Sequence, residues 1–229
     1  MKLSVLLATM LFGAVGIASA APVCIGGTMA SYEGLAGGCT IGNLLFSNFF
    51  YTGGASGAGV SAVLNTAITL TPVNVGTFSP GPGIVFTSSG WNVPAGSSTS
   101  DVIIDSSILF DVSSVDGRQI LVDGTLTLLS AASTGSGVAE IGETIEPGNV
   151  QLQVNANGPL VSHTIYPAQT TVSVDKDVLV LVPQGGPGSA SIGSFAENFS
   201  EMPEPVGSVL IGSGLLALGI WRRRVSRRS

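Results

Sequence analysis

The body of this 229-residue chain contains no amphipathic helical stripe, and its apolar residues fall instead into short segments. Segments 68–71, 125–128 and 151–155 alternate with a period of two, 177–182 is a short continuous apolar run, and 102–109 supplies two short apolar patches. Alternating residues of a strand point to opposite faces of a sheet, so this pattern is typical of half-buried β-strands. The chain also holds 32 Gly and 12 Pro, residue types that disfavour helix interiors. The body is therefore predicted to be all-β.

Clusters of Gly, Pro, Ser and Asn separate the apolar segments, notably at 79–83, 94–98 and 184–188, and predict turns. Asp123-Gly124 stands between two short apolar runs, which is a hairpin signal. About nine or ten strands at this spacing predict an antiparallel β-sandwich or a jelly-roll-like ectodomain. A propeller or solenoid is disfavoured because no fixed-period repeat is visible.

The N-terminal segment has the organisation of a secretory signal peptide. Met1 and Lys2 form a short positive region, an apolar run extends from Leu3 to Ile17, and Ala18-Ser19-Ala20 is a small-residue cleavage signal. The alternative is an N-terminal membrane anchor, but the run is short for a spanning helix, which needs about 20 residues. We predict a signal helix over 1–20 that is removed after Ala20.

The C-terminal segment predicts a transmembrane helix with a basic flank. Residues 206–221 carry no charge and would span about 24 Å as a helix. The arginines that follow are Arg222, Arg223, Arg224, Arg227 and Arg228. Positive charge beside a helix stays cytoplasmic, which places the body outside. The alternative, a buried core helix with a solvated basic end, fits the arginine cluster poorly.

The order Pro203-Glu204-Pro205, a short apolar helix and an arginine cluster resembles the PEP-CTERM sorting signal. The resemblance covers 203–229 and implies recognition by exosortase, a membrane-embedded, transpeptidase-like enzyme. It also implies removal of the tail near Pro-Glu-Pro and delivery of the body to the cell surface or extracellular matrix. Such proteins occur in Gram-negative bacteria that make exopolysaccharide. The resemblance says little about the body, because very different ectodomains carry this tail.

These segments divide the chain into four parts. We expect a signal peptide over 1–20, a β-rich extracellular domain over 21–190, a last strand or linker over 191–202, and the sorting signal over 203–229. The sorting signal comprises Pro-Glu-Pro at 203–205, the transmembrane helix at 206–221 and the arginine-rich tail at 222–229. The expected partners are the secretion translocon, signal peptidase, exosortase and, transiently, the inner membrane. The expected location is a membrane-anchored precursor and then the cell surface or medium.

The charge is distributed unevenly between these parts. Between residues 21 and 205, Arg118 and Lys176 are the only basic residues, against all 14 acidic residues, which gives this segment a formal charge of −12. Nucleic-acid binders need a basic face, so nucleic acid is excluded as a partner. Dispersed negative charge also resists binding to other polyanions.

Cys24 and Cys39 are the two cysteines of the chain. An exported chain enters an oxidising compartment, where such a pair is expected to form a disulfide. The alternative is a metal-binding pair, but the chain holds a single histidine and so lacks other soft ligands. We predict the disulfide.

Sequence motifs for catalysis are absent from the chain. No nucleophile elbow, Walker A motif, dinucleotide fingerprint or His-Glu-x-x-His pair occurs, and His163 is the only histidine. Pairs of carboxylates hydrolyse glycosides, and Asp175 and Asp177 would share one face of a strand, but acids at such positions are commonly only solvated. We predict no enzyme activity, no catalytic residue, no metal site and no cofactor. A structural calcium ion held by loop carboxylates is left open.

Aromatic residues suggest a second function. Carbohydrate-binding modules present flat aromatic platforms, and both the aromatic cluster at 46–51 and Trp91 are candidates for one, although either can equally pack in the core. We therefore predict a non-enzymatic surface or matrix protein that is associated with exopolysaccharide or biofilm. The alternative is a carbohydrate-binding module that contacts sugar through Trp91, with or without calcium.

Overall fold

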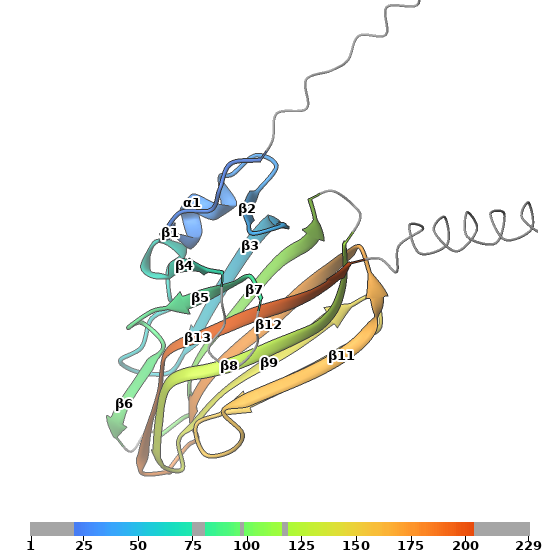
Figure 1. Ribbon diagram of the computed structural model, residues 1–229. Helices are drawn as coiled ribbons and strands as arrows, with labels where there is room; N and C mark the ends of the chain where they lie inside the picture. The colour runs from blue at the N-terminus through green and yellow to red at the C-terminus, as the bar shows by residue number, and fades with distance from the viewer. Residues whose placement is uncertain (1–20, 75–80, 97–98, 116–118, 204–229) are drawn as a thin grey trace, which may run out of the picture.

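The described residues of the computed structural model, 21–74, 81–96, 99–115 and 119–203, form two antiparallel β-sheets packed face to face (Figure 1). The prediction of an all-β, antiparallel sandwich is confirmed. The predicted signal helix at 1–20 and the residues 204–229 lie outside the described part of the chain. Within that part, no helix combines the length and apolarity that crossing a bilayer requires.

One sheet has six strands, in the order β10-β9-β12-β7-β3-β2. These strands are β10 (Val150–Asn155), β9 (Val138–Glu146), β12 (Thr171–Val182), β7 (Val102–Ser114), β3 (Leu44–Ser56) and β2 (Cys39–Ile41). Their inner face packs on the other sheet, and their outer face points away from the core.

The other sheet has seven strands, in the order β1-β4-β5-β13-β8-β11, with β6 paired to β13 outside this path. These strands are β1 (Gly27–Thr28), β4 (Thr69–Val73), β5 (Gly83–Thr87), β13 (Gly188–Pro203), β8 (Gln119–Gly135), β11 (Val161–Gln169) and β6 (Asn92–Gly96). A five-residue helix, α1 (Met29–Glu33), lies at the end of the sandwich that carries β1 (Figure 1). A 3-10 turn, η1 (Asn65–Ala67), packs against α1 and β1.

The predicted hairpin at Asp123-Gly124 is wrong, because both residues lie inside the continuous strand β8. Gly124 is buried, and a Cβ atom there would lie 2.8 Å from Ile145 Cδ1 of the facing sheet. The glycine therefore permits close approach of the two sheets rather than a turn. The turn predicted over 94–98 is also partly wrong, since residues to Gly96 belong to β6, where a proline is tolerated because the strand pairs on one side only.

Residues 191–202, for which strand and linker were both open, belong to β13. This strand pairs along β8 from Gly188 opposite Gly135 to Pro203 opposite Gln119, and it also pairs with β5. The folded body therefore runs directly into the Pro-Glu-Pro motif, whose first residue, Pro203, ends the strand.

The core between the sheets is aromatic and aliphatic, with one charged exception. Rings such as Phe46, Phe110 and Phe199 pack against one another with centroids 6.2 to 6.5 Å apart. Among them lie Lys176 of β12, Glu143 of β9 and Glu197 of β13, with exposed fractions of 0%, 4% and 0%. We call these three residues the buried triad.

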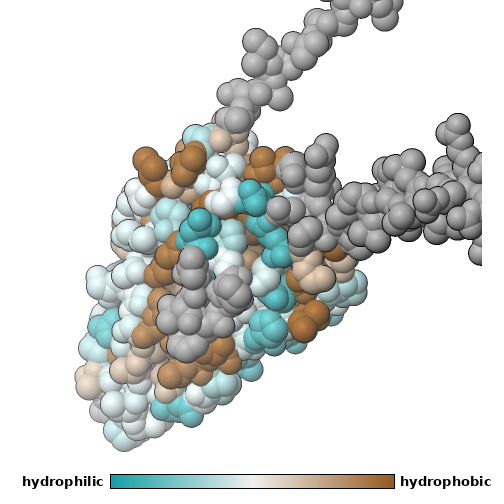
Figure 2. All heavy atoms as spheres, in the orientation of Figure 1, coloured by the Kyte–Doolittle hydropathy of each residue, from teal (hydrophilic) through white to brown (hydrophobic). Residues whose placement is uncertain are grey.

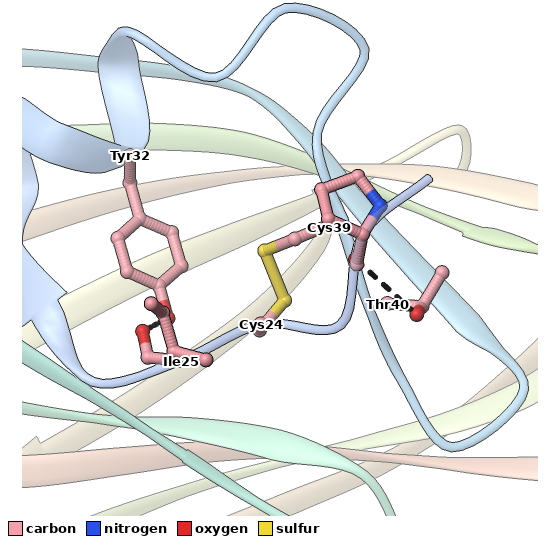
Figure 3. The surroundings of a disulfide bond; sticks show 6 residues. Cys24, Ile25, Tyr32, Cys39 and Thr40 are labelled. Carbon is pink, nitrogen blue, oxygen red and sulfur yellow. Dashed lines mark hydrogen bonds between the residues drawn. A yellow bond between two sulfur atoms is a disulfide. The ribbon is translucent and has the colours of Figure 1, made fainter. Parts of the chain in front are cut away.

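Cys24 and Cys39 form a disulfide, as predicted (Figure 3). It fastens the N-terminal segment of the body to β2, where the Cys24 amide also donates a hydrogen bond to the Thr40 carbonyl at 2.9 Å. The Tyr32 hydroxyl of α1 donates to the Ile25 carbonyl at 2.8 Å (Figure 3). The bond and these contacts hold α1 and the N-terminal segment against the edge of the six-stranded sheet.

Replacing both cysteines, Cys24→Ala with Cys39→Ala, should lower the free energy of unfolding by about 3 kcal/mol, because the disulfide closes a loop with a sequence separation of 15 residues. Urea denaturation of the variant and the wild type measures the difference. Wild-type protein under reducing conditions is the control and should lose the same amount. Equal midpoints for oxidised wild type and variant would contradict the prediction.

Candidate functional site

The outer face of the six-stranded sheet carries an array of polar side chains. Burial alternates along β12 and β7, so the odd-numbered residues from 173 to 177 and from 105 to 111 point outward. The prediction that Asp175 and Asp177 share one face is confirmed. We call this surface the outer polar face; its polar members include Asp105, Ser107, Asp111, Thr144, Gln151, Gln153, Ser173, Asp175 and Asp177.

Three adjoining hollows run across the outer polar face, with volumes of about 490, 390 and 320 Å³. Asp175 lines all three, so the hollows meet at this side chain. The first reaches Gln151 and Gln153 on β10, and the third reaches Thr52 on β3. With neighbouring strands about 4.8 Å apart, the face from β10 to β3 is about 19 Å wide.

Hydrogen bonds along the face hold several of its carboxylates in place. Asn48 Nδ2 donates to Asp111 Oδ2 at 2.7 Å, and the Ser173 hydroxyl donates to the other oxygen of the same carboxylate. Ser107 Oγ donates to Asp175 Oδ1 at 3.3 Å. Each carboxylate oxygen has more than one lone pair, so these groups are oriented and can still accept hydrogen bonds from a ligand.

A β-bulge in β3 turns one aromatic ring onto this face. The pairing of β3 with β7 shifts between Ser47 and Phe50, and Asn48 has a φ of 54°. The extra residue inverts the alternation, so that Phe49 points inward and Phe50 is 55% exposed beside Asp111. The aromatic cluster at 46–51 is therefore mainly core, and Phe50 is its exposed exception.

The prediction that Trp91 contacts sugar is wrong. Its side chain is 0% exposed, its ring centroid lies 5.6 Å from that of Phe195, and Nε1 donates to Ser106 Oγ at 3.0 Å. Packing the indole in the core buries a large apolar area and satisfies its single donor. Trp91 is a core residue and presents no surface to a ligand.

The other ionisable residues considered in the sequence analysis do not lie together. His163 on β11 lies on the other sheet, with Nε2 3.6 Å from Asp123 Oδ2. Asp101 is exposed and accepts a hydrogen bond from the Gln184 amide. Within the described ranges, no group of three or more His, Cys, Asp or Glu side chains converges as a metal site. Glu204, Pro205 and the five arginines of the tail lie outside those ranges.

The sequence interpretation missed the buried triad and the exposure of Phe50. A signal for Lys176 is present, because it occupies an inward position in a line of buried valines on β12, between Val174 and Val178. No comparable signal marks Glu143 or Glu197 as its partners. Phe50 depends on the bulge, which has no motif of its own in the sequence.

Exposed apolar side chains line one further hollow, of about 430 Å³, at the N-terminal segment; Val23 and Ile25 contribute to it, and no charged side chain of the described residues does. Figure 2 shows one face of the molecule, on which apolar side chains form several separate patches among polar ones. Singly scattered apolar residues are ordinary on protein surfaces. The outer polar face is therefore the candidate site.

Comparisons with known proteins find only distant structural similarity. No family model and no curated protein matches the chain. The chain resembles TmCBM61 in complex with beta-1,4-galactotriose over 66% of its length and 88% of that chain, at 12% identity and a TM-score of 0.27. It resembles a family 11 carbohydrate-binding module from Clostridium thermocellum, in complex with a beta-1,3-1,4-mixed-linked tetrasaccharide, over 76% and 96%, at 10% identity and a TM-score of 0.22.

A third similar structure is the enzymatically active domain of bacteriophage CBA120 tailspike protein 4. The match covers 66% of this chain and 19% of that one, at 13% identity and a TM-score of 0.24. Similarity at these scores carries no inference about a ligand or an activity, so any function has to be argued from the site itself.

Asp177 makes the outer polar face sensitive to pH. Its pKa is raised to about 6, mainly by partial burial and in addition by a hydrogen bond with Asp105 and the negative charges of Asp105, Asp175 and Glu140. Between about pH 4 and 6, the folded state therefore holds a proton at Asp177 that the unfolded state releases, so this residue's contribution to stability falls as the pH rises.

Asp177→Asn should raise the melting temperature at pH 7, where the wild type carries the repelled charge, and should change it much less at pH 4. Thermal unfolding of both proteins from pH 4 to 8 measures the difference. Asp101→Asn, an exposed carboxylate off this face, is the charge-matched control and should show no such growth with pH. An effect of Asp177→Asn that is equal at pH 4 and pH 7 would contradict the prediction.

Proposed function

We propose that this chain is an exported, non-enzymatic protein of the cell surface or extracellular matrix that binds a neutral exopolysaccharide on its outer polar face. The observation that carries the proposal is the run of adjoining hollows centred on Asp175, lined by oriented carboxylate, amide and hydroxyl groups.

Export is supported by a sequence pattern and by the disulfide. The signal-peptide pattern at 1–20 predicts translocation, and the Cys24–Cys39 disulfide suits an oxidising compartment outside the cytoplasm. The Pro-Glu-Pro motif, apolar segment and arginine cluster favour sorting by exosortase. Because β13 ends at Pro203, processing near this motif would leave the folded body intact.

The chemistry of the outer polar face suits sugar hydroxyls. Aspartate oxygens accept hydrogen bonds from hydroxyl groups, and the amides of Gln151 and Gln153 both donate and accept them. The exposed ring of Phe50 offers an apolar surface for the C–H face of a sugar at one side of the hollows. A sheet face about 19 Å wide accommodates several linked sugar units, which favours a polymer over a monosaccharide.

The charge of the face selects among polysaccharides. Asp105, Asp111, Asp175 and Asp177 all line its hollows, and no lysine or arginine in the described part of the chain does. Anionic polymers would meet like charge at close range, which costs binding free energy. The preferred ligand is therefore a neutral, hydroxyl-rich glycan.

One pair of carboxylates on the face does not suit glycoside hydrolysis. Asp105 and Asp177 hydrogen-bond to each other. Glycoside hydrolases need their two carboxyl groups at least about 5 Å apart, so that the sugar or a water molecule fits between them. This pair is too close for that mechanism.

Asp175→Ala should weaken binding to neutral polysaccharide by about tenfold or more, because a lost hydrogen bond to a charged group costs about 1.5 to 3 kcal/mol. Affinity electrophoresis or a pull-down against neutral glucans and galactans, with an anionic alginate alongside, measures the affinity. Phe50→Ala should weaken binding as well.

The matched controls are Asp101→Ala, an exposed carboxylate off the face, and Ile165→Ala, an exposed apolar residue on β11 of the other sheet. Both should bind as the wild type does. Wild-type affinity in Asp175→Ala, or binding to alginate alone, would overturn the assignment of the face.

The mature protein recovered from the cell surface or medium should begin at Ala21 and lack 222–229. Intact-mass spectrometry locates both ends. Glu204→Ala should retain the tail, because it alters the proposed processing motif, whereas Glu201→Ala, three residues earlier in β13, should be processed normally. Surface-exposed wild-type protein that still carries Arg222 to Ser229 would contradict exosortase processing.

A further inference from the structure

The buried triad brings one amine and two carboxyl groups together in the core. Lys176 on β12 stands directly opposite Glu143 on the neighbouring strand β9 in the antiparallel register. Both side chains point inward, and the Lys176 amine contacts Glu143 Oε2. Glu197 reaches the same amine from the facing sheet, with Oε2 2.9 Å from Nζ.

In their ionised forms, these three side chains leave an unbalanced charge in an apolar core. One ammonium and two carboxylates leave a net negative charge in a core where Lys176 and Glu197 are 0% exposed. The aromatic ring of Phe110 lies 5.8 Å from Nζ. Among the described residues, nothing donates a hydrogen bond to Glu143 Oε1. Buried charges with missing partners are strongly destabilising, so the ionised triad destabilises the fold.

Burial drives Lys176 and Glu197 toward their neutral forms. Desolvation lowers the pKa of Lys176, although the charge of Glu197 opposes this shift. Desolvation raises the pKa of Glu197, again opposed by its charged partner. A neutral amine is a nucleophile, and a protonated carboxyl is a general acid. The dry core therefore favours an amine that can attack and an acid that can donate a proton.

We propose that Lys176 Nζ and the side-chain carboxyl of Glu143 condense spontaneously to an amide cross-link between β12 and β9, with Glu197 as the acid–base group. The ground for this proposal is the placement of the three side chains: an amine directly opposite a carboxyl group on a paired strand, and a second buried carboxyl group in hydrogen-bond contact with the amine.

The reaction needs no co-reactant. Transfer of a proton from the Lys176 ammonium group to the Glu143 carboxylate that it contacts gives a neutral amine and a protonated carboxyl group. The amine then attacks the Glu143 Cδ carbon and forms a tetrahedral intermediate. Glu197 accepts a proton from the attacking nitrogen and delivers one to the departing hydroxyl, which leaves as water. One C–N bond forms, one C–O bond breaks, and Glu197 ends as it began.

The cross-linked product carries fewer buried charges than the ionised triad. The cross-link replaces an ammonium and a carboxylate with a neutral amide, and one oxygen that lacked a donor departs with the water. Glu197, whose Oε2 lies 2.9 Å from the Lys176 nitrogen, can accept a hydrogen bond from the new amide N–H. The cross-link also ties strands 33 residues apart in sequence, which restricts the unfolded chain and suits a protein exposed outside the cell.

Peptide mapping of the full-length chain, purified under denaturing conditions, tests the proposal independently of how its ends are processed. Arg118 and Lys176 are the only tryptic sites between 21 and 203. We expect cleavage after Arg118 but none after Lys176, and a fragment one water lighter than its sequence. A second protease should then release a branched peptide joining Glu143 to Lys176.

The variants separate the roles of the three side chains. Lys176→Met and Glu143→Ala should show the sequence mass, and Glu197→Gln, which keeps the side-chain size, should stay uncondensed or condense at least tenfold more slowly. Glu140→Gln, on β9 and outside the triad, is the matched control and should lose one water like the wild type. Disulfide formation and near-ultraviolet circular dichroism report folding of each variant.

Complete tryptic cleavage after Lys176 in denatured wild-type protein, with no loss of water in any peptide, overturns the proposal without reliance on any variant. Wild-type rates of condensation in folded Glu197→Gln overturn the acid–base role of Glu197.

Discussion

The burial of Lys176 constrains both sheets at once. A lysine in an apolar core is tolerated only where carboxyl groups meet it, and here one comes from the neighbouring strand and the other from the facing sheet. A slip of one residue in β12 would turn the amine outward and bring Asp175 or Asp177 into the core, which is prohibitively costly. The buried triad therefore holds β9, β12 and β13 in one register.

The outer polar face follows from the same register. Asp175 and Asp177 flank Lys176 along β12, so the alternation that buries the lysine points both aspartates to the opposite side of the sheet. One strand thus carries the centre of the core on one face and the centre of the candidate site on the other. A rigid, well-registered sheet is a suitable base for a binding surface whose groups must keep fixed spacing.

Local irregularities then shape what the two sheets present. The bulge at Asn48 reverses the direction of the following residues, and this places Phe50 beside Asp111. Gly124 acts on the packing of the sheets instead. Because it has no side chain, Ile145 of the facing sheet can approach β8 closely. Together with the disulfide near the N-terminus, these features give a compact body that continues directly into the predicted sorting signal.

Period-two alternation and the lack of a helical stripe were sufficient to predict an all-β antiparallel sandwich, the common face of Asp175 and Asp177, and, with the export signals, the Cys24–Cys39 disulfide. These properties depend on local side-chain direction or on residues close in sequence. The true roles of Asp123-Gly124 and Trp91 were not predictable, because a glycine serves a turn or a close approach equally well and an indole suits a core or a platform.

The sequence by itself determined the strand class, the common face of Asp175 and Asp177 and the acidic character of the body. Only the tertiary structure decided which carboxyl groups meet that lysine, which aromatic ring stays exposed and where the hollows lie. The physical reason is that these contacts join strands whose residues are 21 and 33 positions apart, through a register that no local pattern encodes.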